Sequence, residues 1–472
     1  MKVTGFDNVE RFRDFRMEKG ENEHSNCFFS FADYDFSDYA GKLDMQVKII
    51  EDDCCLMTGK VAKVELIQKG VEHIVTVTVY SESYGWDLEK KTRVFQKQGQ
   101  TYRDIVNQIT DLGNMEVAIS GEVKEQKLPG PLVQLNETDF SFLKRIAKDG
   151  FGKPLFIKNN NGKSGRCMIG SEDSEIREVK DEELTSLAAA FDLESRKIEF
   201  TISGSVESQE LRQYVDVGKI IRWNHQDYTI DRLVVKKTEG VYRFWCMARS
   251  EQRQKEQRKE IQPACLFHAK IFQNEDPDHY GRVLLDFQGT SHGISVEDMT
   301  KDDQMWYDVL TPYTANNGGI VFIPEKDDCV EAVWNGESFY VIGSRRTVEL
   351  SEQYKDIQLK QIGNLHNKNI CFSEEALELS SEESKVTLYN DKVQIEIPDS
   401  RVVVTKEEIS VETKDSKALL NSDIVLDSGT VHIDADKLQN NIKNQYQCES
   451  KNIGFNASSV VKIEGKGKVS IN

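Results

Sequence analysis

The chain has 472 residues, which at about 150 residues per domain indicates roughly three domains. Its 61 basic and 80 acidic residues give a formal net charge of -19, which argues against a general nucleic-acid binder or a binder of anionic lipid. Hydrophobic residues make up 38% of the chain, enough for folded cores, and no window approaches the roughly 18 apolar residues of a membrane span.

The N-terminus and the cysteines indicate where the chain folds. The first sixteen residues lack the apolar segment of a secretory signal, and the nine cysteines lack the paired spacing of a disulfide framework or a zinc site. We therefore expect assembly in the cytoplasm with reduced thiols, and no cofactor. A folded protein can still leave the cell through a dedicated export machine, so the final location is a separate question.

The segment up to residue 249 is dominated by β-strand patterns. Val61–Ile67 and Val71–Tyr80 are rich in β-branched residues and predict a hairpin that turns at Lys69 and Gly70. Further strands are predicted at 197–203, 219–223, 228–236 and 241–248.

Two short helices are expected within the same segment. The first starts at Thr101, which has the character of an N-cap, and closes at Gly113. The second starts near Thr138, carries an apolar stripe and stops at Gly150. These helices are too few and too short to change the expected class, which is mainly β with minor α.

A change of composition separates this segment from the next one. Residues 250–262 are rich in Glu, Gln, Arg and Lys without an apolar face, which is typical of a solvated linker. Short strands with turn signals then resume from 265 to 344, a pattern typical of a small barrel. We accordingly divide the chain into a domain at 1–249, a linker at 250–264, a barrel at 265–346, a neck at 347–371 and a tail at 372–472.

The tail consists of short strands with one apolar face. Apolar residues recur two apart between polar residues, and those expected to form its core are Val393, Ile395, Val402, Ile409, Ile424 and Ile433. One chain has only thin apolar ridges here and cannot build a globular core from them. A single-chain β-helix needs about 20 residues per coil, more than the spacing of these ridges, so we favour strands of several chains intertwined in a spike.

Two sets of residues carry a resemblance to a known family. Around the second helix these are Glu137, Asp139, Phe142 and Arg145, and in the barrel they are Gly281, Arg282, Val283, Trp306, Phe322, Pro324, Gly336 and Gly343. In order and spacing they resemble VgrG, the valine-glycine repeat protein of type VI secretion, and the hub-spike proteins of contractile phage tails. Asp327 departs from the pattern, because the family usually has a glycine there.

The resemblance implies a phage-hub-like β domain, an OB-fold barrel and a C-terminal trimeric β-helix spike. It implies a homotrimer whose hub has two tube-like subdomains per chain and meets an Hcp-like tail-tube hexamer and baseplate proteins. A PAAR-like tip protein would sit at the C-terminal end, with effector cargo possible and contact with a target membrane only during injection. The chain would be delivered outside the cell or into a target cell by a type VI system, a phage tail, a tailocin or a related injector.

The remaining motifs do not indicate catalysis. The G-x-S-x-G match at 289–293 lacks a strand-to-helix framework, and the phosphate-loop-like run at 161–164 lacks its first glycine. His432 faces away from its apolar neighbours, so an ion site on the spike axis is not expected. We expect no catalytic, cofactor or metal residues. The alternative is a β-helical cell-wall or polysaccharide hydrolase with carboxylates on its coil surface, such as the pairs at 374–375 and 382–383.

Overall fold

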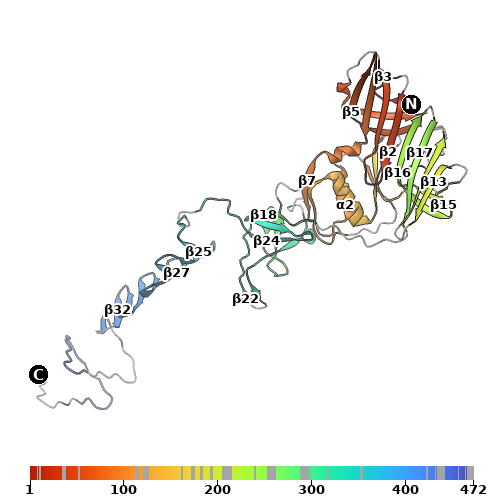
Figure 1. Ribbon diagram of the computed structural model, residues 1–472. Helices are drawn as coiled ribbons and strands as arrows, with labels where there is room; N and C mark the ends of the chain where they lie inside the picture. Colours follow the sequence, from red (N-terminus) through yellow and green to blue (C-terminus); the bar gives the residue numbers. More distant parts are fainter. Residues whose placement is uncertain are drawn as a thin grey trace. The chain divides into compact units, whose positions relative to one another are not determined.

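The computed structural model describes residues 1–7, 9, 12–33, 39–51, 54–111, 116–120, 127–160, 163–171, 176–180, 184–191, 195–204, 215–238, 241–251, 262–287, 297, 299–315, 318–350, 355–420, 424–430, 432, 442–454, 456–462 and 464. They fall into two compact units, Met1–Thr347 and Val348–Asn472, which we describe separately (Figure 1). Both units are built mainly from β-strands, as the sequence predicted.

A 12-stranded sheet dominates the first unit. Its strands are β1 (Lys2–Val3), β2 (Phe12–Gly20), β3 (Asn26–Asp33), β4 (Gln46–Glu51), β5 (Cys54–Lys69), β6 (Glu72–Tyr80), β12 (Arg177–Glu178), β13 (Leu184–Phe191), β14 (Ser195–Gly204), β15 (Ile220–Trp223), β16 (Gln226–Thr238) and β17 (Val241–Glu251). The order is β1-β4-β5-β6-β3-β2-β16-β17-β14-β13, and β15 pairs with both β12 and β16. All six strands predicted here match β5, β6 and β14 to β17, and two of them, those predicted from Val71 and Lys219, begin one residue before the observed strand.

This sheet contains the same four-stranded unit twice. The β5-β6 hairpin and the β16-β17 hairpin share their register at a shift of 169 residues, since Lys60 faces Tyr80 in one and Thr229 faces Arg249 in the other. Each hairpin has a β-bulge at the equivalent position, at Ala62 and Asp231. The pairing of β2 with β3 also contains a bulge, and the pairing of β13 with β14 contains one at the matching place. The repeat therefore covers four strands in each half: β2, β3, β5 and β6 in the first, and β13, β14, β16 and β17 in the second.

The two repeats meet where β2 pairs antiparallel with β16, which Figure 1 shows near the middle of the sheet. One hydrophobic core underlies both halves and includes fully buried residues such as Phe29, Val77, Ile230 and Cys246. Alternate residues of β6 are buried, which is the pattern expected of a strand with one face on a core. The halves therefore fold as one continuous sheet.

The segment between the two repeats in the sequence contains both predicted helices. It comprises η2 (Glu82–Asp87), β7 (Lys90–Phe95), α1 (Tyr102–Asp111), β8 (Glu116–Ile119), β9 (Leu132–Thr138), α2 (Asp139–Phe151), β10 (Leu155–Asn160) and β11 (Lys163–Ile169), and a 3-10 turn, η1 (Ala40–Lys42), lies earlier in the chain. Both predicted helices are present, and Gly113, the expected end of the first, lies outside the described residues. Thr101 and Asp104 bond reciprocally at the start of α1, and the Thr138 hydroxyl accepts a bond from the Ser141 amide at the start of α2.

The end of α2 lies one residue beyond the expected stop. Gly150 is inside the helix, and Gly152, with a φ of +63°, forms the left-handed cap that favours glycine. A Cβ on Gly150 would lie 2.6 Å from the ring of Tyr102. This glycine therefore serves the close approach of α1 to α2 and does not terminate the helix.

The closed barrel of the first unit has the strand order of an OB-fold. Its strands are β18 (Cys265–Gln273), β19 (Val283–Asp286), β20 (Trp306–Val309), β23 (Cys329–Trp334) and β24 (Phe339–Ser344), with η5 (Lys301–Asp303) before β20 and the short pair β21 (Thr314–Ala315) and β22 (Gly318–Gly319) after it. The barrel closes in the order β18-β19-β20-β24-β23, and only β20 and β24 run parallel. Packed aromatic rings fill it, including Phe267, Phe287, Phe339 and Trp334.

The second unit contains a nine-stranded antiparallel sheet in which each strand pairs with the next. The strands are β25 (Lys360–Gly363), β26 (Lys368–Phe372), β27 (Ala376–Ser381), β28 (Ser384–Tyr389), β29 (Lys392–Ile397), β30 (Ser400–Thr405), β31 (Ile409–Thr413), β32 (Ser416–Leu420) and β33 (Ile424–Ser428). The sheet begins at Lys360, within the range that we assigned to a neck. Gln361 and Ile362 already show the alternation of polar and apolar residues, so the strands begin before residue 372, where we expected the tail to start.

Within the single chain this sheet has its own pairing, and the intertwining of three chains stays a prediction. Each described strand from β25 to β33 pairs with its sequence neighbour in the same chain. The described turns from 364 to 415 have two to four residues. The one-faced strands are confirmed, whereas the association of three such sheets stays a prediction. Among its core positions, Ile433 lies outside the described residues.

Candidate functional site

The helix motif of residues 137–145 lies where the sheet domain meets the barrel. Strands β7 and β9 form a two-stranded ribbon between two cores. Val94 and Val133 of this ribbon join the barrel core, whereas Phe95 and Leu132 join the core around α1 and α2. Because successive residues of a strand face opposite sides, one ribbon can bind both cores at once. The ribbon therefore connects the two domains of the first unit.

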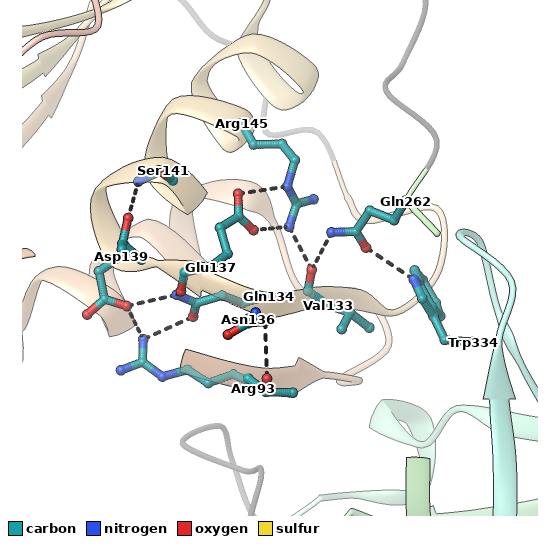
Figure 2. Close-up of polar contacts among 12 residues, drawn as sticks. Arg93, Val133, Gln134, Asn136, Glu137, Asp139, Ser141, Arg145, Gln262 and Trp334 are labelled. Carbon is teal, nitrogen blue, oxygen red and sulfur yellow. Dashed lines mark hydrogen bonds and ion pairs between the residues drawn. The ribbon is translucent and has the colours of Figure 1, made fainter. Parts of the chain in front are cut away.

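Arg145 of α2 connects that helix to the ribbon (Figure 2). Its guanidinium lies 2.9 Å from a carboxylate oxygen of Glu137 and donates a 2.6 Å bond to the carbonyl of Val133. It also stacks over the ring of Phe142 at 4.9 Å. Three of the four predicted motif residues, Glu137, Phe142 and Arg145, thus form one cluster.

Gln262 extends this cluster to the barrel. Its amide donates to the same Val133 carbonyl at 3.1 Å and accepts a 3.1 Å bond from the indole of Trp334, as Figure 2 shows. Neither residue was among those predicted from the sequence. The alternation of Cys329–Trp334 could have placed Trp334 in the barrel core, but nothing in the sequence pairs it with Gln262.

Asp139, the fourth motif residue, forms a buried ion pair on the other side of the ribbon. Its carboxylate accepts bonds from Arg93 at 2.8 Å, from Lys91 at 2.7 Å and from Gln134 at 3.0 Å. Only 2% of the Arg93 side chain is exposed, so its charge depends on this carboxylate. The motif consequently places one ion pair on each side of the start of α2.

The barrel motif organises a loop around Asp276. Arg282 binds this carboxylate with two nitrogens, at 2.9 Å and 2.8 Å, and three backbone amides of the same loop donate to it. The bonds from Arg282 hold the pKa of Asp276 well below its usual value. Gly281 precedes the arginine with a φ of +75°, where a side chain would be strained. Val283 follows it into the core.

The other predicted barrel residues divide into two groups. Gly336 has a φ of +98° in the β23-β24 turn, which favours glycine, and Pro324 is half-buried with its carbonyl bound by Asn274. Trp306 is half-buried in β20. Phe322 is 65% exposed and Gly343 has open space around it, so neither lies in the core of this chain.

Asp327 keeps the backbone conformation that the missing glycine would supply. Its φ is +73°, in the left-handed region that aspartate tolerates better than most residues. Its carboxylate pairs with Lys270 at 2.7 Å. The turn is therefore preserved by a different residue type.

We predict that Arg282→Lys loosens the barrel loop. A lysine keeps the charge but cannot bind Asp276 with two nitrogens in the same geometry, so the loop should lose about 1.5 kcal/mol, or roughly tenfold in opening. Hydrogen exchange of the segment 274–286 measures this. Lys270→Ala, which removes an exposed ion pair, should leave the exchange of that segment within about twofold, and equal effects of the two changes would contradict the role of Arg282.

The tail sheet presents one apolar face and one charged face. On the apolar face two columns of side chains run across the strands, one through Ile370, Leu379, Val386, Ile395, Val402 and Val411, the other through Phe372, Leu377, Leu388, Val393, Val404, Ile409 and Leu420. The predicted core residues Val393, Ile395 and Ile409 are 37%, 43% and 40% exposed in the single chain. A continuous apolar surface of this kind marks an interaction site.

The charged face carries residues of alternating sign. Lys385 lies 3.2 Å from Glu396 and 3.8 Å from Glu378, and Arg401 lies 3.8 Å from Glu396. Lys417 continues the series with Glu412 at 2.5 Å. Like charges are kept apart across neighbouring strands, which favours this register of the sheet.

These carboxylates do not have the properties of a glycosidase acid. Bonds from Gln394 and Lys385 lower the pKa of Glu396, and a bond from Lys417 lowers the pKa of Glu412. An acid catalyst in a hydrolase needs a raised pKa. His432 is exposed, and the runs at 161–162 and 289–293 lie outside the described residues. No helix in the described part of the chain is long and apolar enough to cross a membrane.

Comparison with known proteins shows which solved structures have a similar fold. No family model matches the sequence, and no curated protein matches it significantly. An E. coli protein, described as a type VI secretion component similar to the bacteriophage T4 tail proteins gp27 and gp5, superposes with a TM-score of 0.52 at 12% identity over 73% of this chain and 99% of its own. A chain of a PdpA-VgrG complex superposes with a TM-score of 0.51 at 7% identity over 89% of this chain and 94% of its own.

The chain has a hub-spike fold. A chain of the Francisella PdpA-VgrG complex in its half-lidded form agrees, with a TM-score of 0.50 at 7% identity over 88% of this chain and 83% of its own. The resemblance to VgrG and phage hub-spike proteins is thereby confirmed at the level of the fold. The assignment of the 12-stranded sheet to a hub and of the tail sheet to a spike stays a prediction.

Proposed function

We propose that the chain is the structural hub and spike of a contractile injection system and acts as a homotrimer without catalysis. The observation that carries this proposal is the apolar face of the tail sheet. In the part of the chain that the structure describes, most side chains of its two columns are at least 36% exposed. Three such sheets facing inward would bury all of these columns around a common axis.

The charge of the chain fits the same assembly. Three chains, each with a net charge of -19, form a strongly acidic and well-solvated particle. The ion-paired face of the tail sheet would point outward to water, while the apolar face points inward. Closely packed sheets that bury their apolar faces resist unfolding of one chain at a time, which suits a part that transmits axial force.

The partners follow from this arrangement and from the fold. We propose that the hub binds a hexameric, Hcp-like tail tube and baseplate proteins, because two repeats in each of three chains give six similar units. A PAAR-like tip would close the C-terminal end of the spike, and effectors would travel as cargo. The protein would assemble in the cytoplasm and leave it on firing, contacting the target membrane only in transit.

The mass of the protein in solution tests the proposal. Light scattering after size exclusion should give three chains for the full-length protein, and a weaker association for a chain that ends at Ser344 and lacks the tail sheet. A monodisperse monomer at micromolar concentration would overturn the trimeric hub and spike. The monomeric β-helical hydrolase would then be the alternative to test with polysaccharide substrates.

A further inference from the structure

The face of the 12-stranded sheet that points away from the core carries a row of basic side chains. Arg16 of β2 lies opposite Lys236 of β16, which in turn lies opposite Arg243 of β17. Their neighbours in the chain, such as Val235 and Phe244, are 2% and 5% exposed and belong to the core, so the three basic side chains lie on the other face. We call Arg16, Lys236 and Arg243 the basic row.

The register of the basic row is unfavourable for the sheet by itself. Like charges directly opposite each other destabilise a pair of strands, whereas opposite charges stabilise it. The tail sheet of the same chain follows this rule, because Lys385 lies opposite Glu396 with 3.2 Å between the charged groups. The basic row therefore has a cost in free energy that an anion bound between its side chains would offset.

Two of the three cations have no carboxylate of their own. Glu18, two residues along β2, forms an ion pair with the guanidinium of Arg16. Lys236 and Arg243 are exposed, and neither has a hydrogen bond or an ion pair within the described part of the chain. The basic row is thus neutralised at one end and open at the other.

Other carboxylates on this face are held by neutral donors. Asp14 accepts a 3.0 Å bond from the hydroxyl of Ser30, and Glu199 accepts a 2.6 Å bond from the indole of Trp245. Among the described contacts, neither carboxylate forms a hydrogen bond or an ion pair with the basic row. A partner can therefore supply the missing negative charge.

The geometry of the two open cations suits carboxylates on another protein. Directly opposed residues of a sheet have Cβ atoms about 5 Å apart, so Lys236 and Arg243 can bind one carboxylate together. The guanidinium of Arg243 can also bind both oxygens of a carboxylate in parallel. Nucleic acid fits less well, because its affinity grows with the number of phosphates neutralised, and this row offers two open cations on a chain with a net charge of -19.

We propose that the basic row is a docking site for an acidic segment of a partner protein, whose carboxylates bind Lys236 and Arg243. The negative charge of the rest of the chain repels such a segment elsewhere, so the binding is confined to this row. All three side chains come from one chain, and the site consequently does not depend on the proposed trimer.

Binding of a labelled decaglutamate peptide to the full-length protein tests this site. Fluorescence anisotropy at about 50 mM salt should detect the complex, since surface charges are weakly screened at low ionic strength. The double variant Lys236→Gln with Arg243→Gln should bind roughly tenfold more weakly, because it loses both open charges. Circular dichroism checks its fold. If it unfolded, each single variant, with an expected loss of about threefold, would serve in its place.

A control with the same change of net charge uses lysines that already have partners. Lys60 pairs with Asp44 at 2.9 Å, and Lys270 pairs with Asp327 at 2.7 Å. Lys60→Gln with Lys270→Gln should leave the affinity for the peptide within about twofold of the wild type. Equal losses in the two double variants would overturn the docking site, because the affinity would then follow net charge alone.

A second probe separates the classes of partner. Labelled single-stranded DNA of similar length should bind more weakly than decaglutamate. Tighter binding of the DNA, lost in Lys236→Gln with Arg243→Gln, would overturn the acidic segment in favour of nucleic acid. No binding of the peptide at millimolar concentration would also overturn the site. A chain that binds the peptide through this row but is monomeric by light scattering would overturn the proposed trimer and leave the site intact.

Discussion

A single aspartate at Val402 should abolish the association of the tail. Val402 lies in an apolar column between Ile395 and Val411, which the proposed trimer buries around its axis. Three carboxylates would then be buried close together, each costing several kcal/mol of desolvation without a partner. We expect Val402→Asp to shift the mass measured by light scattering from three chains toward one, or to leave a trimer held by the hub alone whose tail is rapidly cleaved by protease.

The adjacent valine provides a matched control. Val403 is next in the same strand, but its side chain lies on the opposite face, between Gln394 and Ser410. Val403→Asp introduces the same charge on the face opposite the proposed contact surface, so the measured mass should stay at three chains. Equal effects of the two changes would show that the apolar face is not the contact surface.

Removal of the Asp139 carboxylate should cause the largest loss of stability within one chain. Asp139→Ala leaves Arg93 buried without its counter-charge, because the guanidinium is 2% exposed and bonded to this carboxylate at 2.8 Å. Breaking a buried pair by removing one partner costs about 3–5 kcal/mol. We expect the hub to unfold at a lower temperature, measured by circular dichroism or by hydrogen exchange of α2.

An exposed ion pair of the same chemistry gives the comparison. Asp227 binds Arg222 through two bonds, at 2.6 Å and 3.0 Å, but both side chains are more than 40% exposed. Asp227→Ala should cost no more than about 1 kcal/mol, because water solvates the remaining charge. If the two alanine variants unfolded together, burial of Arg93 would not be the reason for the stability of the hub.

The sequence predicted the elements of this fold better than their connections. Local signals sufficed for the two helices, since Thr101 and Thr138 are N-caps with side chains that bind the first turn. They sufficed for the one-faced strands of the tail, because the period of two is direct evidence of a strand with one apolar side. The domain bounds and the packing roles of the motif residues stay predictions.

Long-range contacts lay beyond these local patterns. The duplication in the hub cannot be recognised from the residue types at equivalent positions. Leu66 and Val235 are equivalent and similar, but Ala189 and Met17 are also equivalent and have little in common. It emerges only from the register of the strands and the matched bulges. Likewise, Gln262 binds Val133 across more than a hundred residues of chain, and no spacing rule connects them. The antiparallel pairing within the tail could have been inferred from turns too short for any other connection.

The most direct test of the account is an image of the full-length protein. Electron cryomicroscopy of single particles, viewed along the axis, should show a threefold hub with six similar lobes and a narrow spike whose three sheets face one another. That result would place the apolar columns at the axis and the repeats in a ring. Particles of a single chain, or a dimer with twofold symmetry, would contradict the proposed hub and spike.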